Sequence, residues 1–224
     1  MSVTHSSVPS SESLSAFDSR TRLPWGGLAA LGLLAAALSG CGSSKPVHYF
    51  QLTHPPTSAL ASAQTPIDAT LLVRLFQTSH LYREDRIVYG TDTVQIGLYE
   101  YDRWTGPPVE LLQDAIARGL RASGQFKAVT TLRSDTSVDY YLTGQLYSFR
   151  EVTGNGIVAR LTFDVQLMDA KKGKTVWRHS YTHDEPSGGK SVADLVTAMD
   201  KNVHASVQDL QDGIVQTLTE YTRK

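Results

Sequence analysis

Apolar and polar residues alternate most regularly between Ile157 and Met168. The apolar positions are Ile157, Ala159, Leu161, Phe163, Val165 and Leu167, and Arg160, Thr162, Asp164 and Gln166 stand between them. A period of two places successive side chains on opposite faces of a strand. The segment therefore predicts a strand with one face on the core and the other toward water or a partner. After the charged turn Asp169–Lys174, Thr175–Tyr181 predicts the second strand of a hairpin, and Tyr140–Phe149 predicts another strand before it.

The carboxyl-terminal part of the chain has a helical period instead. Its apolar positions lie three or four residues apart, about 3.6 on average, which is the period of an α-helix. These positions are Val192, Val196, Met199, Val203, Val207, Leu210, Ile214, Leu218 and Tyr221. Ser191, followed three residues later by Asp194, resembles a capping pair at the start of such a helix. The pattern predicts one long helix whose stripe packs on a sheet, with self-association along the stripe as the alternative.

A shorter helix is predicted after Pro107-Pro108, with Glu110 in its first turn. Proline suits the first helical positions, and an acidic side chain complements the positive end of the helix dipole. The apolar stripe of this helix consists of Val109, Leu112, Ile116 and Leu120. Gly119, on the same side, is expected to let the helix lie close to a sheet. Ser123-Gly124 is expected to end it.

Four further β-rich segments are bounded by proline or polar residues and predict short strands. They are Val47–Leu52, Thr70–Phe76, Arg86–Tyr89 and Val94–Tyr101. The last two flank Gly90-Thr91-Asp92, so they predict a hairpin. A proline-containing segment, Thr53–Pro66, predicts a loop.

The amino-terminal region carries an apolar stretch of 16 residues, Leu23–Leu38, after Arg20 and Arg22. At 1.5 Å per residue this stretch reaches about 24 Å, less than the roughly 30 Å hydrocarbon core of a membrane. It therefore resembles a secretory signal, and Leu38-Ser39-Gly40-Cys41 resembles the lipobox of a bacterial lipoprotein. We expect a signal peptide over residues 1–40, lipidation of Cys41, a tether over 41–46 and a single domain over 47–224.

Two features of this leader leave alternatives open. The stretch before the apolar run is rich in serine and carries Glu12 and Asp18, which leaves the true start codon open. A transmembrane or mitochondrial-type leader with an incidental cysteine is the competing interpretation. Gly42 stands where an aspartate would resemble an inner-membrane retention signal, so the expected location is the outer membrane.

Charge and cysteine content restrict the function further. The chain has a formal net charge of −1 at pH 7, which favours neither nucleic acid nor an anionic surface as a partner. Cys41 is the single cysteine, and lipid attachment would consume it. The exported protein would then have neither a disulfide bond nor thiol chemistry.

The motifs that could carry catalysis are incomplete. Ser187–Ser191 sits between a strand and a helix, but a phosphate-binding loop needs a glycine where Asp184 stands. His179 and His183 are four residues apart, a metal-binding spacing on a helix, whereas a strand is predicted here. Serines are plentiful, but the chain contains no Gly-x-Ser-x-Gly elbow. We therefore expect no enzyme, no metal and no cofactor.

Several stretches occur in the order seen in one family. Tyr49-Phe50-Gln51-Leu52 is followed by Leu81-Tyr82 with Arg86–Tyr89, then by Tyr99–Trp104 before the double proline. Gly124-Gln125-Phe126, Asp139–Gly144 and Val176-Trp177 come next. The mature chain thereby resembles the ABC-type transport auxiliary lipoprotein component family, whose members accompany MCE-domain lipid transporters. The resemblance implies an α+β domain in which two helices cover a mixed, largely antiparallel sheet. This fold agrees with the strands and helices predicted above.

The resemblance implies a non-enzymatic, membrane-anchored periplasmic lipoprotein with an N-terminal lipid such as palmitate. Its partners would be an MCE-domain protein and ABC transporter subunits, bridged to the periplasmic face of the outer membrane, and a homo-oligomer is possible. The residues hypothesised to bind the partner are Tyr82, Arg86, Tyr101, Arg103 and Trp104. Asp102-Arg103-Trp104 is the densest cluster of mixed chemistry in the chain, and for it a structural role is the competing interpretation. The alternative function is a lipoprotein activator of a peptidoglycan synthase, a penicillin-binding protein.

Overall fold

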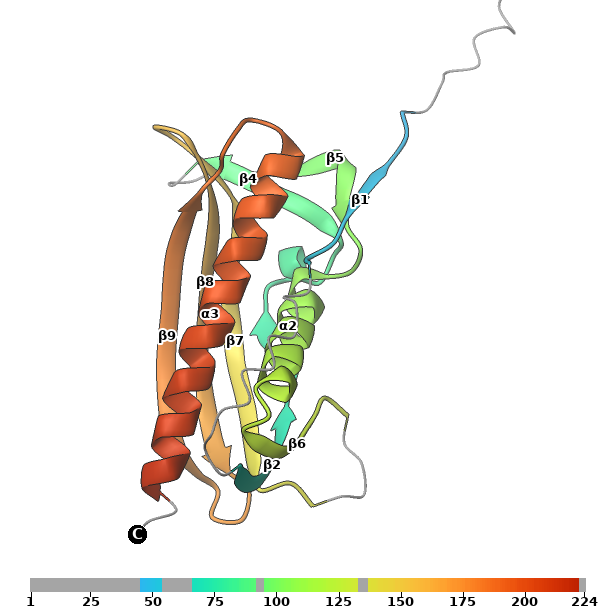
Figure 1. Ribbon diagram of the computed structural model, residues 1–224. Coiled ribbons are helices and arrows are strands. Elements are labelled where there is room, and N and C mark those ends of the chain that lie inside the picture. Colours follow the sequence, from blue (N-terminus) through green and yellow to red (C-terminus); the bar gives the residue numbers. More distant parts are fainter. Residues whose placement is uncertain (1–44, 54–65, 92–94, 133–136, 222–224) are drawn as a thin grey trace, which may run out of the picture. The chain divides into compact units, whose positions relative to one another are not determined.

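Three long antiparallel strands form the largest part of the sheet (Figure 1). They are β7 (Tyr140–Thr153), β8 (Ile157–Asp169) and β9 (Lys174–Pro186). Ala159, Leu161, Phe163, Val165 and Leu167 of β8 are all buried, so the alternation predicted from the sequence is confirmed. The computed structural model describes residues 45–53, 66–91, 95–132 and 137–221. The leader, Cys41 and the first part of the tether lie outside this range.

The second edge of β7 is shared by three segments in turn. All three run parallel to β7, and they are β2 (Ile67–Val73), β3 (Gln77–Thr78) and β4 (Arg86–Thr91). The single-turn helix η1 (His80–Tyr82) separates the last two. β2, β3 and β4 thus pair one after another along the same edge of β7. Because these pairings are parallel and the long β7–β8 and β8–β9 ladders are antiparallel, the sheet is mixed.

Short strands extend the sheet at both ends of this broken edge. β6 (Phe126–Thr130) pairs with β2, β5 (Ile96–Trp104) pairs with β4, and β1 (His48–Phe50) pairs with β5. The β4–β5 pairing confirms the predicted hairpin, whose turn residues 92–94 lie outside the described part. β2 begins and ends three residues earlier than predicted, and the sequence did not indicate β6.

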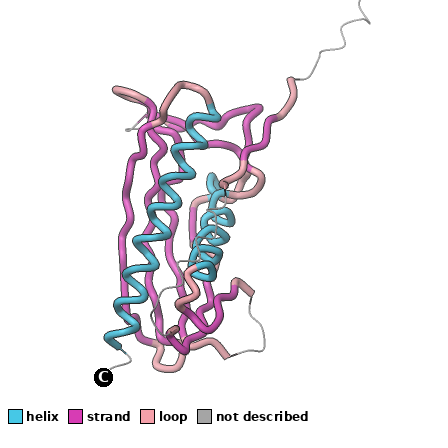
Figure 2. The backbone as a smooth tube through the Cα atoms, viewed as in Figure 1, coloured by secondary structure: helices cyan, strands magenta, loops and turns pink. Residues whose placement is uncertain are grey.

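Both α-helices of the described residues lie on one face of the sheet (Figures 1 and 2). The shorter one is α2 (Pro108–Ala122), and its predicted stripe of Val109, Leu112, Ile116 and Leu120 is buried. A Cβ atom placed on Gly119 would lie 2.2 Å from Cγ1 of Val207 in the other helix. The close approach predicted at Gly119 is therefore made to a helix and not to the sheet.

The long helix α3 (Val192–Tyr221) covers β8 and β9. Most of its predicted stripe is buried, including Met199, Val203 and Leu210, so the stripe packs on the sheet. The predicted cap is present, because the backbone N–H of Asp194 donates to Oγ of Ser191 at 3.1 Å. Over the part of the chain that the structure describes, the result is an α+β fold with a curled mixed sheet and two α-helices, as the sequence predicted.

Candidate functional site

Two of the five residues hypothesised to bind a partner lie inside the protein. Trp104 at the end of β5 is 1% exposed, and its ring meets Phe149 of β7 edge-on with centroids 5.3 Å apart. Tyr82 in η1 is 4% exposed. A partner cannot touch these side chains in this structure, because the rings are covered. Both rings belong to the hydrophobic core beneath the surface that a partner could contact.

The two arginines of the set lie side by side on that surface. Arg86 and Arg103 are cross-strand neighbours in the β4–β5 ladder. Nη2 of Arg86 lies 2.6 Å from Oε2 of Glu84, and Nη1 of Arg103 lies 2.8 Å from Oδ1 of Asp85. All four side chains are about a third exposed or more, so water screens both pairs. The arginines are therefore accessible to the carboxylates of another molecule.

Tyr101 continues this surface along β5 toward the amino-terminal end of the described chain. The ammonium group of Lys45 lies 5.5 Å from the centre of its ring. Across the β1–β5 pairing, Tyr49 lies beside Arg103 and is 63% exposed. The sequence hypothesis did not include Tyr49, although its alternation with the apolar Phe50 could have placed it on the opposite face of the strand.

A buried carboxylate lies behind the hairpin. Glu151 of β7 accepts a hydrogen bond of 2.9 Å from the hydroxyl of Tyr99 in β5. Burial, followed by this bond, raises the pKa of Tyr99 above its ordinary value. The phenol therefore stays protonated at physiological pH and ties β5 to β7.

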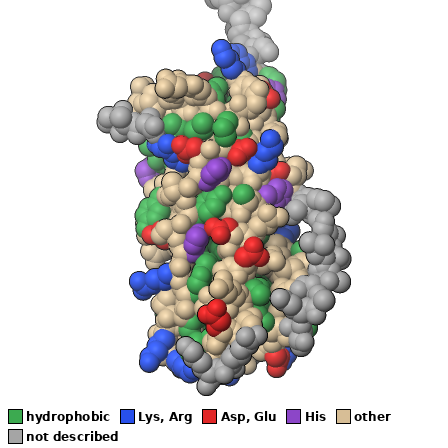
Figure 3. All heavy atoms as spheres, turned by 60° about the vertical axis from the view of Figure 1, so that its left-hand side comes forward, with side chains coloured by type: hydrophobic (Ala, Val, Ile, Leu, Met, Phe, Trp, Pro, Cys, Tyr) green, Lys and Arg blue, Asp and Glu red, His purple; other side chains and the backbone are tan. Residues whose placement is uncertain are grey.

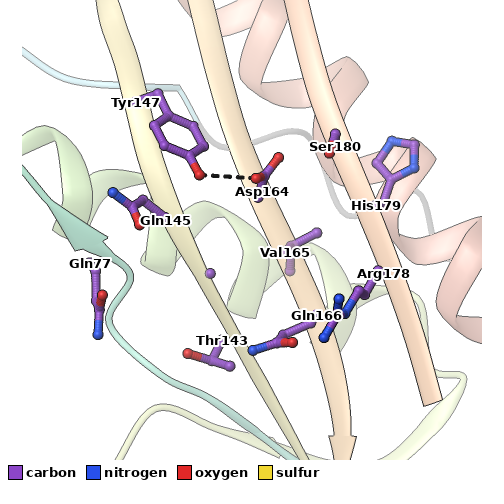
Figure 4. A pocket seen from close by; sticks show the side chains of 11 residues that line it. Gln77, Thr143, Gln145, Tyr147, Asp164, Val165, Gln166, Arg178, His179 and Ser180 are labelled. Carbon is purple, nitrogen blue, oxygen red and sulfur yellow. Dashed lines mark hydrogen bonds between the residues drawn. The ribbon is translucent and has the colours of Figure 1, made fainter. Parts of the chain in front are cut away.

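A hollow of about 510 Å³ opens on the face of β7, β8 and β9 that the helices leave uncovered (Figure 4). The polar residues that line it come from four strands and are Gln77, Thr143, Gln145, Tyr147, Asp164, Gln166, Arg178, His179 and Ser180. The Tyr147 hydroxyl donates to Oδ2 of Asp164 at 3.0 Å, which raises the pKa of Tyr147. Amide and hydroxyl groups dominate this floor, so it suits hydrogen bonding and not an acyl chain.

Histidines lie among acidic side chains on the side of β9 and α3 (Figure 3). Nε2 of His179 lies 2.8 Å from Oδ2 of Asp209 in α3, and Nε2 of His183 lies 3.3 Å from Oε2 of Glu185. The two histidines thus bind different carboxylates. Within the described segments, no three metal-ligating side chains come together, and no helix is long and apolar enough to cross a membrane.

The fold is that of a small α+β protein, and its exposed arginines and polar hollow are surfaces that another molecule can contact. The model of the ABC-type transport auxiliary lipoprotein component family matches residues 50–211, and the chain belongs to this family. Family membership makes it an auxiliary component of ABC-type transport and suggests a membrane-anchored lipoprotein without enzymatic activity. No curated protein matches the chain.

Solved structures support the fold. Protein XCC0632 from Xanthomonas campestris superposes with a TM-score of 0.69 at 18% identity, over 79% of this chain and 100% of that one. An uncharacterised protein gives a TM-score of 0.61 at 12% identity, over 76% and 99% of the two chains. A PelC dodecamer from Paraburkholderia phytofirmans reaches only 0.43 at 17% identity, over 71% and 94%, so its assembly is not carried over to this chain.

Proposed function

We propose that this protein is a non-enzymatic, lipid-anchored auxiliary component of an MCE-associated ABC-type lipid transport system. It is held at the periplasmic face of the outer membrane and bridges the transport machinery to that membrane. The family match over residues 50–211 carries the proposal. The lipobox ending at Cys41 supports the anchor, with residues 1–40 removed, 41–46 as the tether and 47–224 as the domain.

Tethering serves this role because it confines the domain to a thin layer at the membrane and so raises its effective concentration there. In this proposal, Arg86, Arg103 and Tyr101 contact the MCE-domain partner. Tyr82 and Trp104 hold the strands beneath them in place. The two arginine pairs could exchange Glu84 and Asp85 for carboxylates of the partner with little loss, because exposed ion pairs contribute at most about 1 kcal/mol each.

Affinity purification of the acylated protein from membranes, followed by mass spectrometry, tests this function. We expect an MCE-domain protein and ABC transporter subunits to co-purify. An Arg86→Ala/Arg103→Ala variant should lose them. Arg118→Ala is the matched control, because Arg118 in α2 is also ion-paired and has a similar exposed fraction, 36% against 31% for Arg103.

A penicillin-binding protein in place of the transporter would contradict the proposal and favour the peptidoglycan synthase activator. The chain offers little support for that alternative. Only three residues separate Cys41 from Lys45, the first residue of the compact unit. Such a tether keeps the domain at the membrane and cannot carry it far into the cell wall.

A further inference from the structure

We propose that Lys45, Val47 and Tyr49 form a membrane-contact patch, which touches the lipid headgroups of the membrane in which Cys41 is anchored. The inference rests on the proposed lipidation of Cys41. It adds a second point of contact between the domain and the membrane, separate from the acyl group itself.

The two members of the patch with large apolar side-chain area are both exposed, and they lie two residues apart. Tyr49 is 63% exposed and Val47 is 41% exposed, although both are large apolar residues. They lie at the beginning of the described chain, next to the tether. Contact with the membrane would remove part of this apolar area from water, which is favourable.

The backbone of β1 fixes the direction in which the patch faces. Tyr49 pairs with Arg103 and Phe50 pairs with Trp104 in the parallel β1–β5 ladder. Phe50 packs against the core beside the buried Trp104. Since neighbouring residues of a strand point to opposite faces, Tyr49 points away from the core. Tyr49 therefore stays outward for as long as β1 is paired.

Chain length keeps this patch near the lipid. Lys45 is four residues after Cys41, and an extended chain spans at most about 3.6 Å per residue, so their Cα atoms are at most roughly 14 Å apart. Tyr49 is at most roughly 29 Å from Cys41 by the same rule. β1 is bound to β5, and the segment after it is bound to Asp200 of α3 through Thr53. The tether therefore cannot lengthen by pulling this segment from the domain without breaking these bonds.

The chemistry of the three side chains suits the headgroup region of a membrane. Tyrosine places an apolar ring and a polar hydroxyl at the boundary between acyl chains and water. Lysine can extend its ammonium group to a lipid phosphate while its methylene stem lies on apolar surface. Lys45 also lies over Tyr101, and Tyr49 lies beside Arg103, so the patch adjoins the proposed docking surface along β5.

Depth-dependent fluorescence quenching tests the patch. Protein purified from membranes is reconstituted into vesicles of phosphatidylethanolamine and phosphatidylglycerol, with and without lipids brominated near the headgroup. Tyr49→Trp places a reporter in the patch. Tyr147→Trp is the matched control, because Tyr147 is 50% exposed on the uncovered face of β7. The wild-type signal from the native tryptophans is subtracted, and circular dichroism checks that both variants fold.

We expect brominated lipid to quench the added fluorescence of the Tyr49→Trp variant, with a blue shift, and to leave that of the Tyr147→Trp variant unchanged. Mass spectrometry of the same samples reports the lipid on Cys41. A lipidated Tyr49→Trp variant quenched no more than the control overturns the patch and leaves the anchor standing. A position 49 reporter shielded from aqueous quencher only when a transporter partner is added assigns the surface to protein and overturns the patch. An unmodified Cys41 removes the anchor, and the patch with it.

Discussion

The carboxylate of Asp200 in α3 accepts hydrogen bonds from both the backbone N–H and the hydroxyl of Thr53. The backbone bond is 2.8 Å long and joins residues 147 positions apart. Thr53 follows β1, a strand of only three residues. The segment that leads back to the proposed lipid anchor is therefore fastened at two places, to β5 by strand pairing and to α3 by this carboxylate.

Replacing Asp200 with alanine should loosen the segment before the rest of the domain. Hydrogen bonds to a charged group contribute about 1.5–3 kcal/mol, and here two of them are lost. Hydrogen exchange of residues 45–53 should accelerate, while exchange in β7 and β8 changes little. Asp212→Ala is the control, because Asp212 is an exposed carboxylate of the same helix. Equal protection of residues 45–53 in both variants would show that strand pairing alone holds this segment.

A methyl group at Gly119 should disrupt the contact between the helices. The added Cβ would overlap Cγ1 of Val207 at 2.2 Å, so either the Val207 side chain must leave its rotamer or α2 and α3 must move apart. We expect Gly119→Ala to lower the free energy of unfolding by about 1–3 kcal/mol. On an unpacked helix the same change would raise stability by about 1 kcal/mol. Urea denaturation measures the difference.

Val207→Ala should rescue the Gly119→Ala protein, because it removes the methyl groups that the new Cβ meets. The double variant would then be more stable than the sum of the two single changes predicts. Additive losses would mean that the two helices do not meet at this pair.

The amide of Asn202 joins α3 to the sheet at a buried position. Its Nδ2 donates to the carbonyl oxygens of Ala159 at 2.9 Å and His183 at 3.0 Å. Asn202→Ala leaves these oxygens without this donor, which should cost about 1–3 kcal/mol for each one left unsatisfied. Gln208→Ala, an exposed amide on the same helix, should change stability by less than about 0.5 kcal/mol. Similar denaturation midpoints for the two variants would argue against this role of Asn202.

The sequence predicts the long elements well because each repeats its period many times. β8 alternates over most of its length, and α3 keeps a helical stripe from its first turn to its last. β6 is different, because only the first of its five residues is buried and its place depends on pairing with β2. The sharing of one edge of β7 by β2, β3 and β4 also depends on contacts between distant segments, which local periodicity does not encode.

The candidate docking surface shows the same limit. The sequence identifies Arg103 and Trp104 as a cluster of mixed chemistry, but neighbouring residues of a strand face opposite ways. Arg103 reaches the surface, and Trp104 is covered because Phe149 of β7 packs against it. Which of the two meets solvent follows from the tertiary packing of β5 on β7, and a single stretch of sequence does not carry that information.

Asp169 should make stability depend on acid pH. Its Oδ1 accepts hydrogen bonds from the backbone N–H groups of Lys172 at 2.8 Å and Lys171 at 2.9 Å, in the turn between β8 and β9. The Lys172 N–H is the largest cause of a lowered pKa for Asp169. Burial comes second and opposes it, and the Lys171 N–H then lowers the pKa further. Because the unfolded chain binds this proton more readily, the contribution to stability is complete above the unfolded pKa of about 3.9. It is lost as the pH falls through the lower folded value.

Asp169→Asn should therefore unfold at lower urea concentration than wild type at neutral pH, and the gap should narrow as the pH falls below about 4. Urea denaturation over a pH series measures this gap directly. Asp212→Asn serves as the reference, because it removes an exposed carboxylate from the same protein. Its denaturation midpoint should stay close to that of wild type at every pH. A gap for Asp169→Asn that stays constant into acid would mean that the loss of one acceptor oxygen, and not the loss of the negative charge, destabilises the variant. A gap that closes means that the negative charge stabilises the turn, because protonation then makes the wild-type carboxyl as neutral as the asparagine amide.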